Sequence, residues 1–233
     1  MYAVEQDYAR PTLDIDFLGY EISNDMDGLI NVFAEICALE DYDDGVRFDF
    51  EKITAEEINE ARDYIGTRLT IVARLDSIKQ PLKVDIGFGD VLVEQPKVLS
   101  YQPEIETLKA PKVLAYSLET VVAEKFQAMV DLAEVNSRLK DFYDVYGILT
   151  KHDINQDLLI ASIVATFKNR GTPYLENHPL FKPEFAQDKS RLVQWKAVLK
   201  KQKKNLELDF ELVMKTIVER LEPIFEQMNT VAM

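Results

Sequence analysis

The first half of the chain alternates hydrophobic and polar positions in short runs, the pattern of β-strands with one buried face. Four runs have this pattern: residues 12–20, 46–50, 68–75 and 82–88. The last two predict a hairpin across residues 76–81. Residues 25–39 instead carry hydrophobic residues at helical spacing, behind a Ser23-Asn24-Asp25 cap. The pattern predicts a mixed sheet with at least one helix.

The second half changes to the three- and four-residue spacing of amphipathic helices. Pro96, Pro103 and Pro111 mark an irregular connection, after which Ser117 is placed to cap a helix over 118–132. Further helices are predicted over residues 140–150, 157–168, 185–203 and 206–228. We therefore expect an α+β protein, with a mixed β-sheet domain over residues 1–110 and a helical bundle over residues 111–233.

Two carboxylates one residue apart, Asp14 and Asp16, interrupt the first hydrophobic run. Alternate strand residues share a face, so both aspartates project together while Leu13, Ile15 and Phe17 pack behind them. Paired hard oxygen ligands favour Mg²⁺, which makes phosphoryl or nucleotidyl transfer the first hypothesis. The alternative is a chance Asp-x-Asp sequence at a solvent-facing strand edge.

A third carboxylate, Asp85, lies in a predicted strand that can pair beside the first one. Three carboxylates on adjacent strands suit a two-metal transfer site. In such a site Asp14 and Asp16 hold the Mg²⁺ that binds the triphosphate. Asp85 shares a second ion and helps to deprotonate the attacking hydroxyl.

The helical half contains a second group of charges. Lys125 lies on the helix over 118–132, and Lys140, Asp141 and Asp144 open the next helix, with the aspartates three residues apart on one face. The lysines could contact triphosphate oxygens, and Asp141 or Asp144 could orient a base or a lysine. The alternative is a set of surface charges at a helix start, where Asp complements the helix dipole.

Charge and composition limit the classes of function that fit this chain. The 233 residues, 47% of them hydrophobic, can bury a substantial core. Of the net charge of −14, residues 1–50 contribute most, with 13 acidic and 2 basic residues. This acidity argues against tight non-specific binding to nucleic acid, but it leaves open a local site for one nucleotide or an RNA end. A run of lysines with a nearby arginine is more typical of a solvated helix end than of an RNA guide: Arg191, Lys196, Lys200, Lys201, Lys203 and Lys204.

The single Cys37 excludes an internal disulfide and fits a reducing cytoplasm. Two histidines are too few for typical transition-metal chemistry. No hydrophobic run approaches the ~18 residues of a membrane span, and the chain does not open with a signal sequence. We expect a cytoplasmic protein with no membrane partner.

Four segments, taken in order, resemble the AbiEii-type nucleotidyltransferase toxins of the DNA polymerase β-like superfamily. Residues 10–17 look like the family's metal-binding segment, and residues 83–86 are similar to its third-carboxylate strand. Residues 117–128 look like its lysine helix, and residues 138–146 resemble its Lys-Asp-x-x-Asp motif. The resemblance spans residues 8–175, and four ordered motifs are more specific than any one alone.

The resemblance implies a nucleotidyltransferase fold for the sheet domain, with the active site in a cleft against the helical domain. It implies a bacterial toxin that uses one or two Mg²⁺ ions to transfer a nucleotide from an NTP to a hydroxyl of RNA or protein. A cognate antitoxin would act without direct contact. The implied metal ligands are Asp14, Asp16 and Asp85, with Lys125, Asp141 and Asp144 as further catalytic residues. The implied nucleotide-binding residues are Arg10, Thr12, Lys125 and Lys140.

One departure concerns glycine. Family members carry a Gly-Gly or Gly-Ser turn before the Asp-x-Asp strand, whose backbone amides would cradle the triphosphate. Here no glycine precedes Gly19, so we expect either a start upstream of Met1 or a reduced phosphate cradle. Two other functions stay open: a non-catalytic interaction protein on the same scaffold, and a small-molecule nucleotidyltransferase similar to antibiotic-modifying enzymes.

Overall fold

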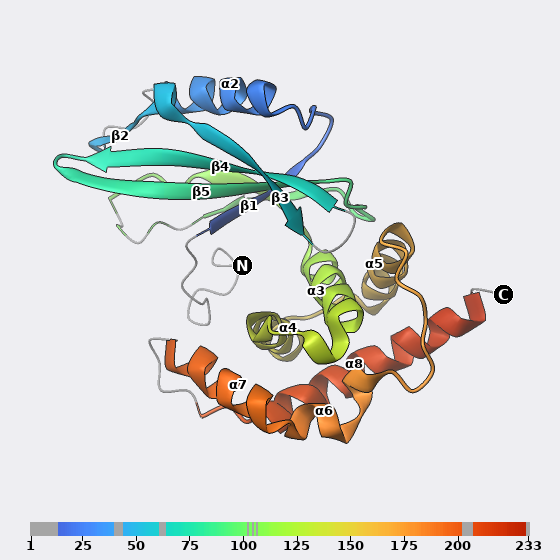
Figure 1. Cartoon of the computed structure of the whole chain (residues 1–233). Coiled ribbons are helices and arrows are strands. Elements are labelled where there is room, and N and C mark those ends of the chain that lie inside the picture. Colours follow the sequence, from blue (N-terminus) through green and yellow to red (C-terminus); the bar gives the residue numbers. More distant parts are fainter. Residues whose placement is uncertain are drawn as a thin grey trace. The chain divides into compact units, whose positions relative to one another are not determined.

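The structure is a computed structural model that describes residues 14–39, 44–60, 64–101, 103, 105, 107–201 and 207–231. The chain divides into two compact units (Figure 1). The sheet unit is built on Pro11–Asp90 with Ile105–Lys109, and the helical unit on Val91–Glu104 and Ala110–Met233. The domain limits expected from the sequence stay a prediction. Each unit is described by itself.

The sheet unit confirms the predicted mixed sheet. Its described strands are β1 (Asp14–Gly19), β2 (Val46–Phe48), β3 (Thr54–Glu60), β4 (Tyr64–Leu75) and β5 (Ile78–Phe88). Their order is β1-β5-β4-β2, with β3 also paired to β4. β1 runs parallel to β5, and the other pairs are antiparallel. A short 3₁₀ turn, η2 (Phe50–Lys52), precedes β3.

One face of this sheet is covered by helix α2 (Met26–Cys37), as Figure 1 shows. The predicted cap is present, because the Asp25 side chain accepts a hydrogen bond from the Gly28 amide at 2.7 Å. The core beneath α2 consists of Leu29, Ile53, Leu69, Ile71, Val84 and Ile86. Because strand residues alternate between faces, the neighbours of Val84 and Ile86 along β5 point to the face opposite α2. That face is polar.

Three elements differ from expectation. The connection between β4 and β5 is only Asp76 and Ser77, with Asp76 in the left-handed region at φ +51°, so β5 begins earlier than predicted. β4 ends at Leu75 as predicted but begins earlier, at Tyr64. β3 was not predicted, because its sequence TAEEINE carries too few hydrophobic residues to alternate. The connection expected to be irregular contains a small antiparallel pair, β6 (Lys97–Ser100) and β7 (Lys112–Ala115).

The helical unit confirms the predicted bundle. Its main helices are α3 (Leu118–Leu132), α4 (Leu139–Lys151), α5 (Gln156–Asn169), α7 (Lys189–Lys201) and α8 (Phe210–Val231). Shorter segments are the 3₁₀ turns η3 (Ala133–Val135) and η4 (Pro179–Phe181) and the five-residue helix α6 (Pro183–Gln187). Ser117 caps α3 as predicted, accepting a hydrogen bond from the Thr120 amide at 3.2 Å. Within the described ranges, no helix is long and apolar enough to cross a bilayer.

The prediction of a single helix over residues 185–203 is wrong. It is divided at Asp188, whose backbone is extended and whose carboxylate accepts a hydrogen bond from the Arg191 amide at 2.8 Å. A side chain that caps a backbone amide three residues ahead starts a new helix. The hydrophobic pattern alone does not show this break.

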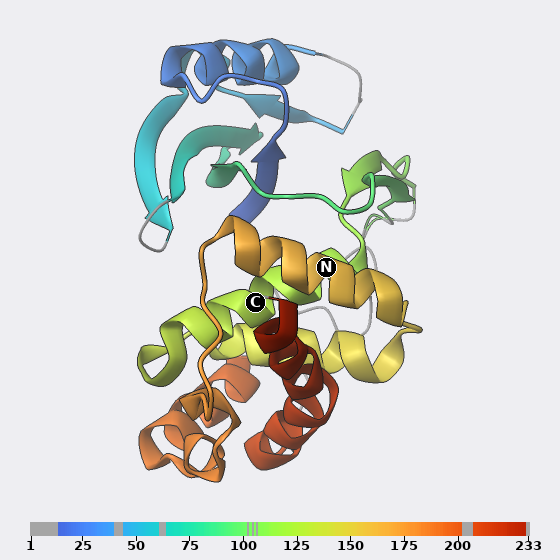
Figure 2. The same ribbon diagram turned by 90° about the vertical axis from the view of Figure 1, so that its right-hand side faces the viewer.

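Aromatic side chains fill the centre of the bundle. Phe126 of α3 is fully buried, and its ring centroid lies 5.5 Å from that of Phe167, 6.2 Å from Phe181 and 6.4 Å from Phe225. Figure 2 shows α3 and α5 side by side above α8. Phe126 therefore connects three other segments of the helical unit.

Replacing Phe126 with alanine tests this role. We expect Phe126→Ala to lower the free energy of unfolding of the helical unit by about 3–5 kcal/mol, because it leaves a cavity among three aromatic rings. Trp195 is the single tryptophan and lies in this unit, so its fluorescence during urea unfolding gives the measurement. Val193→Ala, on the exposed surface of α7, is the control and should change stability by less than about 0.5 kcal/mol.

Candidate active site

The predicted carboxylates of the sheet unit come together through strand pairing. β1 and β5 pair so that Asp16 lies opposite Asp85. On the other side of β5, Arg68 of β4 lies opposite Asp85, and Glu56 of β3 lies opposite Arg68. Directly paired residues share a face of the sheet. These four residues, which we call the carboxylate row, therefore cross the face opposite α2.

Asp85 is the most enclosed member of the row, with 7% of its surface exposed. Both of its oxygens accept hydrogen bonds from Arg68, Nε to Oδ1 at 2.7 Å and Nη2 to Oδ2 at 2.6 Å. This two-point arrangement is the strongest form of ion pair between these side chains. Arg68 was not singled out from the sequence, because its position opposite Asp85 depends on the hairpin register.

The donor chemistry of the row fits a divalent cation. Neighbouring strands lie about 4.8 Å apart, so carboxylates at positions 16 and 85 can share one ion, and carboxylate oxygens are the ligands Mg²⁺ prefers. Among the side chains that the structure describes, no three of His, Cys, Asp or Glu gather as a metal site. Arg10, Thr12 and the side chain of Asp14 lie outside the described residues, although the backbone of Asp14 pairs with Lys83. The three-carboxylate site therefore stays a prediction.

The second predicted group assembles inside the helical unit. Lys125 of α3 places its Nζ 2.6 Å from Asp141 Oδ1 and 3.0 Å from Asp144 Oδ2, both on α4. Arg138 adds an ion pair from Nε to Asp141 Oδ2 at 2.8 Å. The two aspartates meet one lysine because residues three apart lie on the same side of a helix. We call these four residues the lysine cluster.

Lys140 differs from the lysine cluster. It is exposed on α4 and takes part in none of the ion pairs found among the described residues. Asp141 and Asp144 are 4% and 3% exposed, so the interpretation of these aspartates as surface charges is wrong. Of the two interpretations of their role, orienting a lysine matches the contacts.

Burial and the neighbouring carboxylates shift the pKa of Lys125 in opposite directions. Burial disfavours its charged form, but attraction to Asp144 and Asp141, with their hydrogen bonds, outweighs that effect and raises the pKa of Lys125 above 10.5. The lysine is therefore protonated at neutral pH. The helical unit holds a fixed, nearly buried cation.

A buried polar network holds α3 on its other side. Gln127 donates from Nε2 to Thr172 Oγ1 at 2.7 Å and accepts from Arg170 Nη1 at 2.9 Å. Gln127 lies two residues after Lys125, so this network ties the lysine-bearing helix to the segment after α5. The sequence gives little sign of it, because Gln127 and Thr172 are 45 residues apart.

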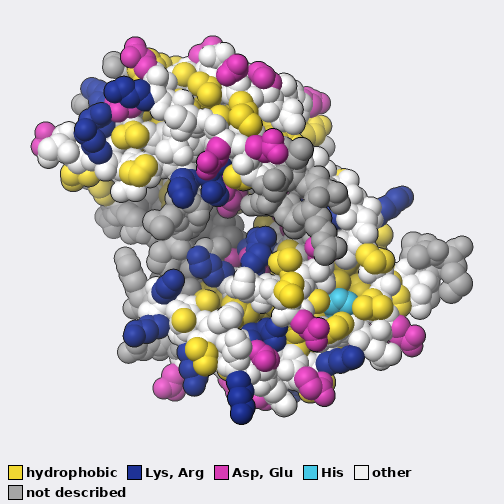
Figure 3. Space-filling view, in the orientation of Figure 1, with side chains coloured by type: hydrophobic (Ala, Val, Ile, Leu, Met, Phe, Trp, Pro, Cys, Tyr) yellow, Lys and Arg dark blue, Asp and Glu magenta, His cyan; other side chains and the backbone are white. Residues whose placement is uncertain are grey.

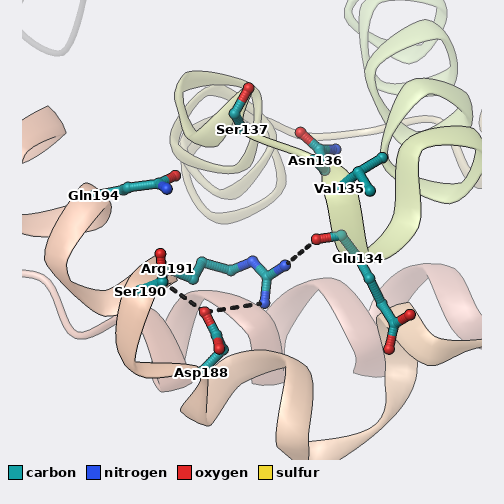
Figure 4. Close-up of a pocket in the computed structure, with 8 residues that line it drawn as sticks. All are labelled: Glu134, Val135, Asn136, Ser137, Asp188, Ser190, Arg191 and Gln194. Carbon is teal, nitrogen blue, oxygen red and sulfur yellow. Dashed lines mark hydrogen bonds and ion pairs between the residues drawn. The ribbon is translucent and has the colours of Figure 1, made fainter.

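A pocket of about 100 Å³ lies elsewhere in the helical unit (Figure 4). It is lined by Glu134, Val135, Asn136, Ser137, Asp188, Ser190, Arg191 and Gln194. Arg191 donates to the carbonyl oxygens of Phe185 at 2.9 Å and Glu134 at 3.0 Å, and it stacks on the Phe185 ring. Pockets for drug-sized ligands run from about 300 Å³ upward, so this one is too small for a nucleoside triphosphate.

The described part of the basic run matches the solvated interpretation, whereas Lys203 and Lys204 lie outside the described residues. Lys196, Lys200 and Lys201 are exposed, whereas Arg191 is only 8% exposed and anchors α7 instead of extending a basic surface. Figure 3 shows Lys and Arg side chains interspersed with acidic ones on the visible face of the helical unit.

The lysine cluster makes a prediction about stability. We expect Lys125→Met to lower the free energy of unfolding by about 3 kcal/mol at pH 8, because it leaves two buried carboxylates without their shared cation. Because the folded protein raises the pKa of Lys125 above its unfolded value of 10.5, this contribution is complete below pH 10.5. It disappears as the pH rises through the folded-state pKa.

Urea unfolding of wild type and Lys125→Met from pH 8 into the alkaline range measures the effect, and the gap between them should narrow only above pH 10.5. Lys140→Met is the matched control, since it removes an exposed lysine from the same helix pair and should leave stability unchanged. Equal losses in the two variants would contradict the assignment.

Comparison with known proteins identifies the family. The family model described as "Nucleotidyl transferase AbiEii toxin, Type IV TA system" matches residues 1–216. Two structures from Helicobacter pylori share the fold. JHP933 is 14% identical, with a TM-score of 0.51, over 99% of this chain and 83% of that one. A putative nucleotidyltransferase is 16% identical, with a TM-score of 0.50, over 99% of this chain and 86% of that one. No curated protein matches. The chain belongs to the AbiEii nucleotidyltransferase toxin family of type IV toxin–antitoxin systems.

Proposed function

We propose that this chain transfers a nucleoside monophosphate from an NTP to a hydroxyl group of RNA or protein, in a reaction that depends on Mg²⁺. The observation that carries the proposal is the pairing of Asp16 with Asp85 across two parallel strands, on a face backed by a hydrophobic core. Family membership supplies the reaction class and the NTP substrate.

In the sheet unit, Asp14, Asp16 and Asp85 are the residues that would hold one or two Mg²⁺ ions. A bound Mg²⁺ neutralises triphosphate charge and makes the acceptor hydroxyl easier to deprotonate. Asp85 assists that deprotonation, and its enclosed position fixes its carboxylate better than an exposed side chain could. Arg10 and Thr12 are proposed to contact the nucleotide.

In the helical unit, Lys125 is proposed to bind a phosphate oxygen. An ammonium group has three N–H donors, and the two contacts to Asp141 and Asp144 leave one for a ligand. The side chain is 17% exposed, and its two ion pairs hold Nζ in place. Lys140, which is exposed, would add a second positive charge.

The proposed roles of the carboxylates and of Lys125 suit phosphoryl transfer. In-line displacement at phosphorus needs positioning and charge neutralisation more than covalent participation by the protein. The carboxylates supply oxygen ligands, and a lysine that stays protonated supplies fixed charge. Neither role needs the histidines or the cysteine.

The carboxylates can be tested by substitution. We expect Asp14→Ala and Asp85→Ala each to reduce transfer by about 100-fold or more, the usual loss when a group that stabilises the transition state is removed. Transfer of label from each α-labelled NTP to total RNA and to total protein gives the measurement, alongside growth inhibition in cells. EDTA should abolish transfer by the wild type, and added Mg²⁺ should restore it.

Glu57→Gln is the matched control, because Glu57 is an exposed carboxylate of β3 that lies beside Glu56 but on the other face. It should transfer like the wild type. If Asp14→Ala and Asp85→Ala also did so, the assignment would be wrong. If the wild type bound no NTP in the presence of Mg²⁺, the non-catalytic interaction protein would be favoured. If labelling appeared only on small molecules, the acceptor would be of the antibiotic-modifying type.

A further inference from the structure

Arg68 stands between two carboxylates of the carboxylate row. On one side it forms the two-point ion pair with Asp85, and on the other side Glu56 lies opposite it across the β3–β4 pairing. Side chains paired in this way have Cβ atoms about 5 Å apart, within reach of an arginine. Glu56 is exposed, whereas Asp85 is buried. One guanidinium therefore has two acceptors on the same face.

The buried acceptor needs a cation. Asp85 lies opposite Asp16 of the next strand, and an enclosed carboxylate without a positive partner is strongly destabilising. Arg68 meets that need in this structure. It does so by engaging both Asp85 oxygens, the atoms through which Asp85 would bind Mg²⁺.

A guanidinium and a divalent cation on one carboxylate repel each other. Arg68 can yield its place because its side chain is 28% exposed, compared with 10% for the side chain of Asp85. A long side chain at a partly open position has room to turn. Because Glu56 is exposed, the released guanidinium can pair with its carboxylate without burying another charge.

We propose that Arg68 is a positioning residue that exchanges between Asp85 and Glu56. As long as Asp85 binds no metal, Arg68 pairs with it and holds it in place. When Asp85 becomes a metal ligand, Arg68 turns to Glu56. Arg68 thus competes with the divalent cation, and Glu56 favours cation binding by accepting Arg68. The inference rests on the proposed function, because it takes Asp85 as a metal ligand.

Titration with Mn²⁺, followed by the electron paramagnetic resonance signal of the free ion, tests the exchange without any assay of activity. Arg68→Ala removes the competitor, so we expect Mn²⁺ to bind about threefold or more tightly than to the wild type. Arg68→Lys keeps the charge but cannot form the two-point pair, so its affinity should lie between those of the wild type and Arg68→Ala. A thermal melt of each variant checks that it is folded.

Glu56→Gln provides the opposite change in a variant that leaves the Asp85–Arg68 pair intact. Without its second acceptor Arg68 stays on Asp85, and Mn²⁺ should bind about twofold to threefold more weakly. Glu57→Gln, which removes the same charge from the opposite face, should have no effect. In an Arg68→Ala background, Glu56→Gln should also have no effect, because Glu56 acts through Arg68.

The outcomes separate this inference from the proposed function. If the wild type binds Mn²⁺ and Asp85→Asn weakens it, the metal site stands. Unchanged affinity in both Arg68→Ala and Glu56→Gln would then overturn the exchange alone. If Glu56→Gln weakened Mn²⁺ binding equally in the wild-type and Arg68→Ala backgrounds, Glu56 would act only through its charge. That result would also overturn the exchange. If the wild type binds no Mn²⁺, both proposals fall.

Discussion

The parallel pairing of β1 with β5 is the contact on which the carboxylate site depends. Its register places Asp16 opposite Asp85 and, one step along, Phe17 opposite Ile86. Phe17 lies on the α2 side, with its ring centroid 6.2 Å from that of Phe33, and Ile86 is part of the core there. Side chains alternate with a period of two, so a slip of one residue would turn carboxylates toward the core. Burial of Ile86 under α2, with the half-exposed Phe17 beside Phe33, therefore favours the register that sets Asp16 and Asp85 on the opposite face.

Much of this arrangement could be predicted, because strong local signals agree with it. The Asp-x-Asp run is a strand, Asp85 lies on the strand beside it, and Ser117 starts the lysine-bearing helix. In each case a hydrophobic period or a capping residue that lies within a few positions of the element predicts it. The sequence suggested that Asp141 or Asp144 could orient a base or a lysine, but it did not show that Lys125 is that lysine, since nothing local indicates that α3 and α4 bring them together.

Other features could not be predicted, because they depend on contacts distant in sequence. β3 is a strand only because β4 supplies a neighbour for its polar sequence, as the pairing of Glu56 with Arg68 shows. The role of Arg68 follows from a hairpin with a two-residue turn, whereas the sequence suggested a longer connection. The break at Asp188 comes from one side-chain cap, which a hydrophobic pattern does not register. Strand register, turn length and helix caps therefore determine features that composition and hydrophobic periodicity do not predict.

Among the described strands, β1 is hydrogen-bonded on one side only, since it ends the order β1-β5-β4-β2. A strand at the edge of a sheet opens by local fluctuation at lower free energy than the strands inside it, and its amide hydrogens exchange sooner with solvent. The strand that carries Asp16 is thus among the less protected parts of the sheet unit. Any ligand that bridges Asp16 to Asp85 would join this edge strand to its neighbour through side chains as well as through backbone. Binding of such a ligand would therefore stabilise β1, and slower amide exchange along β1 would report it.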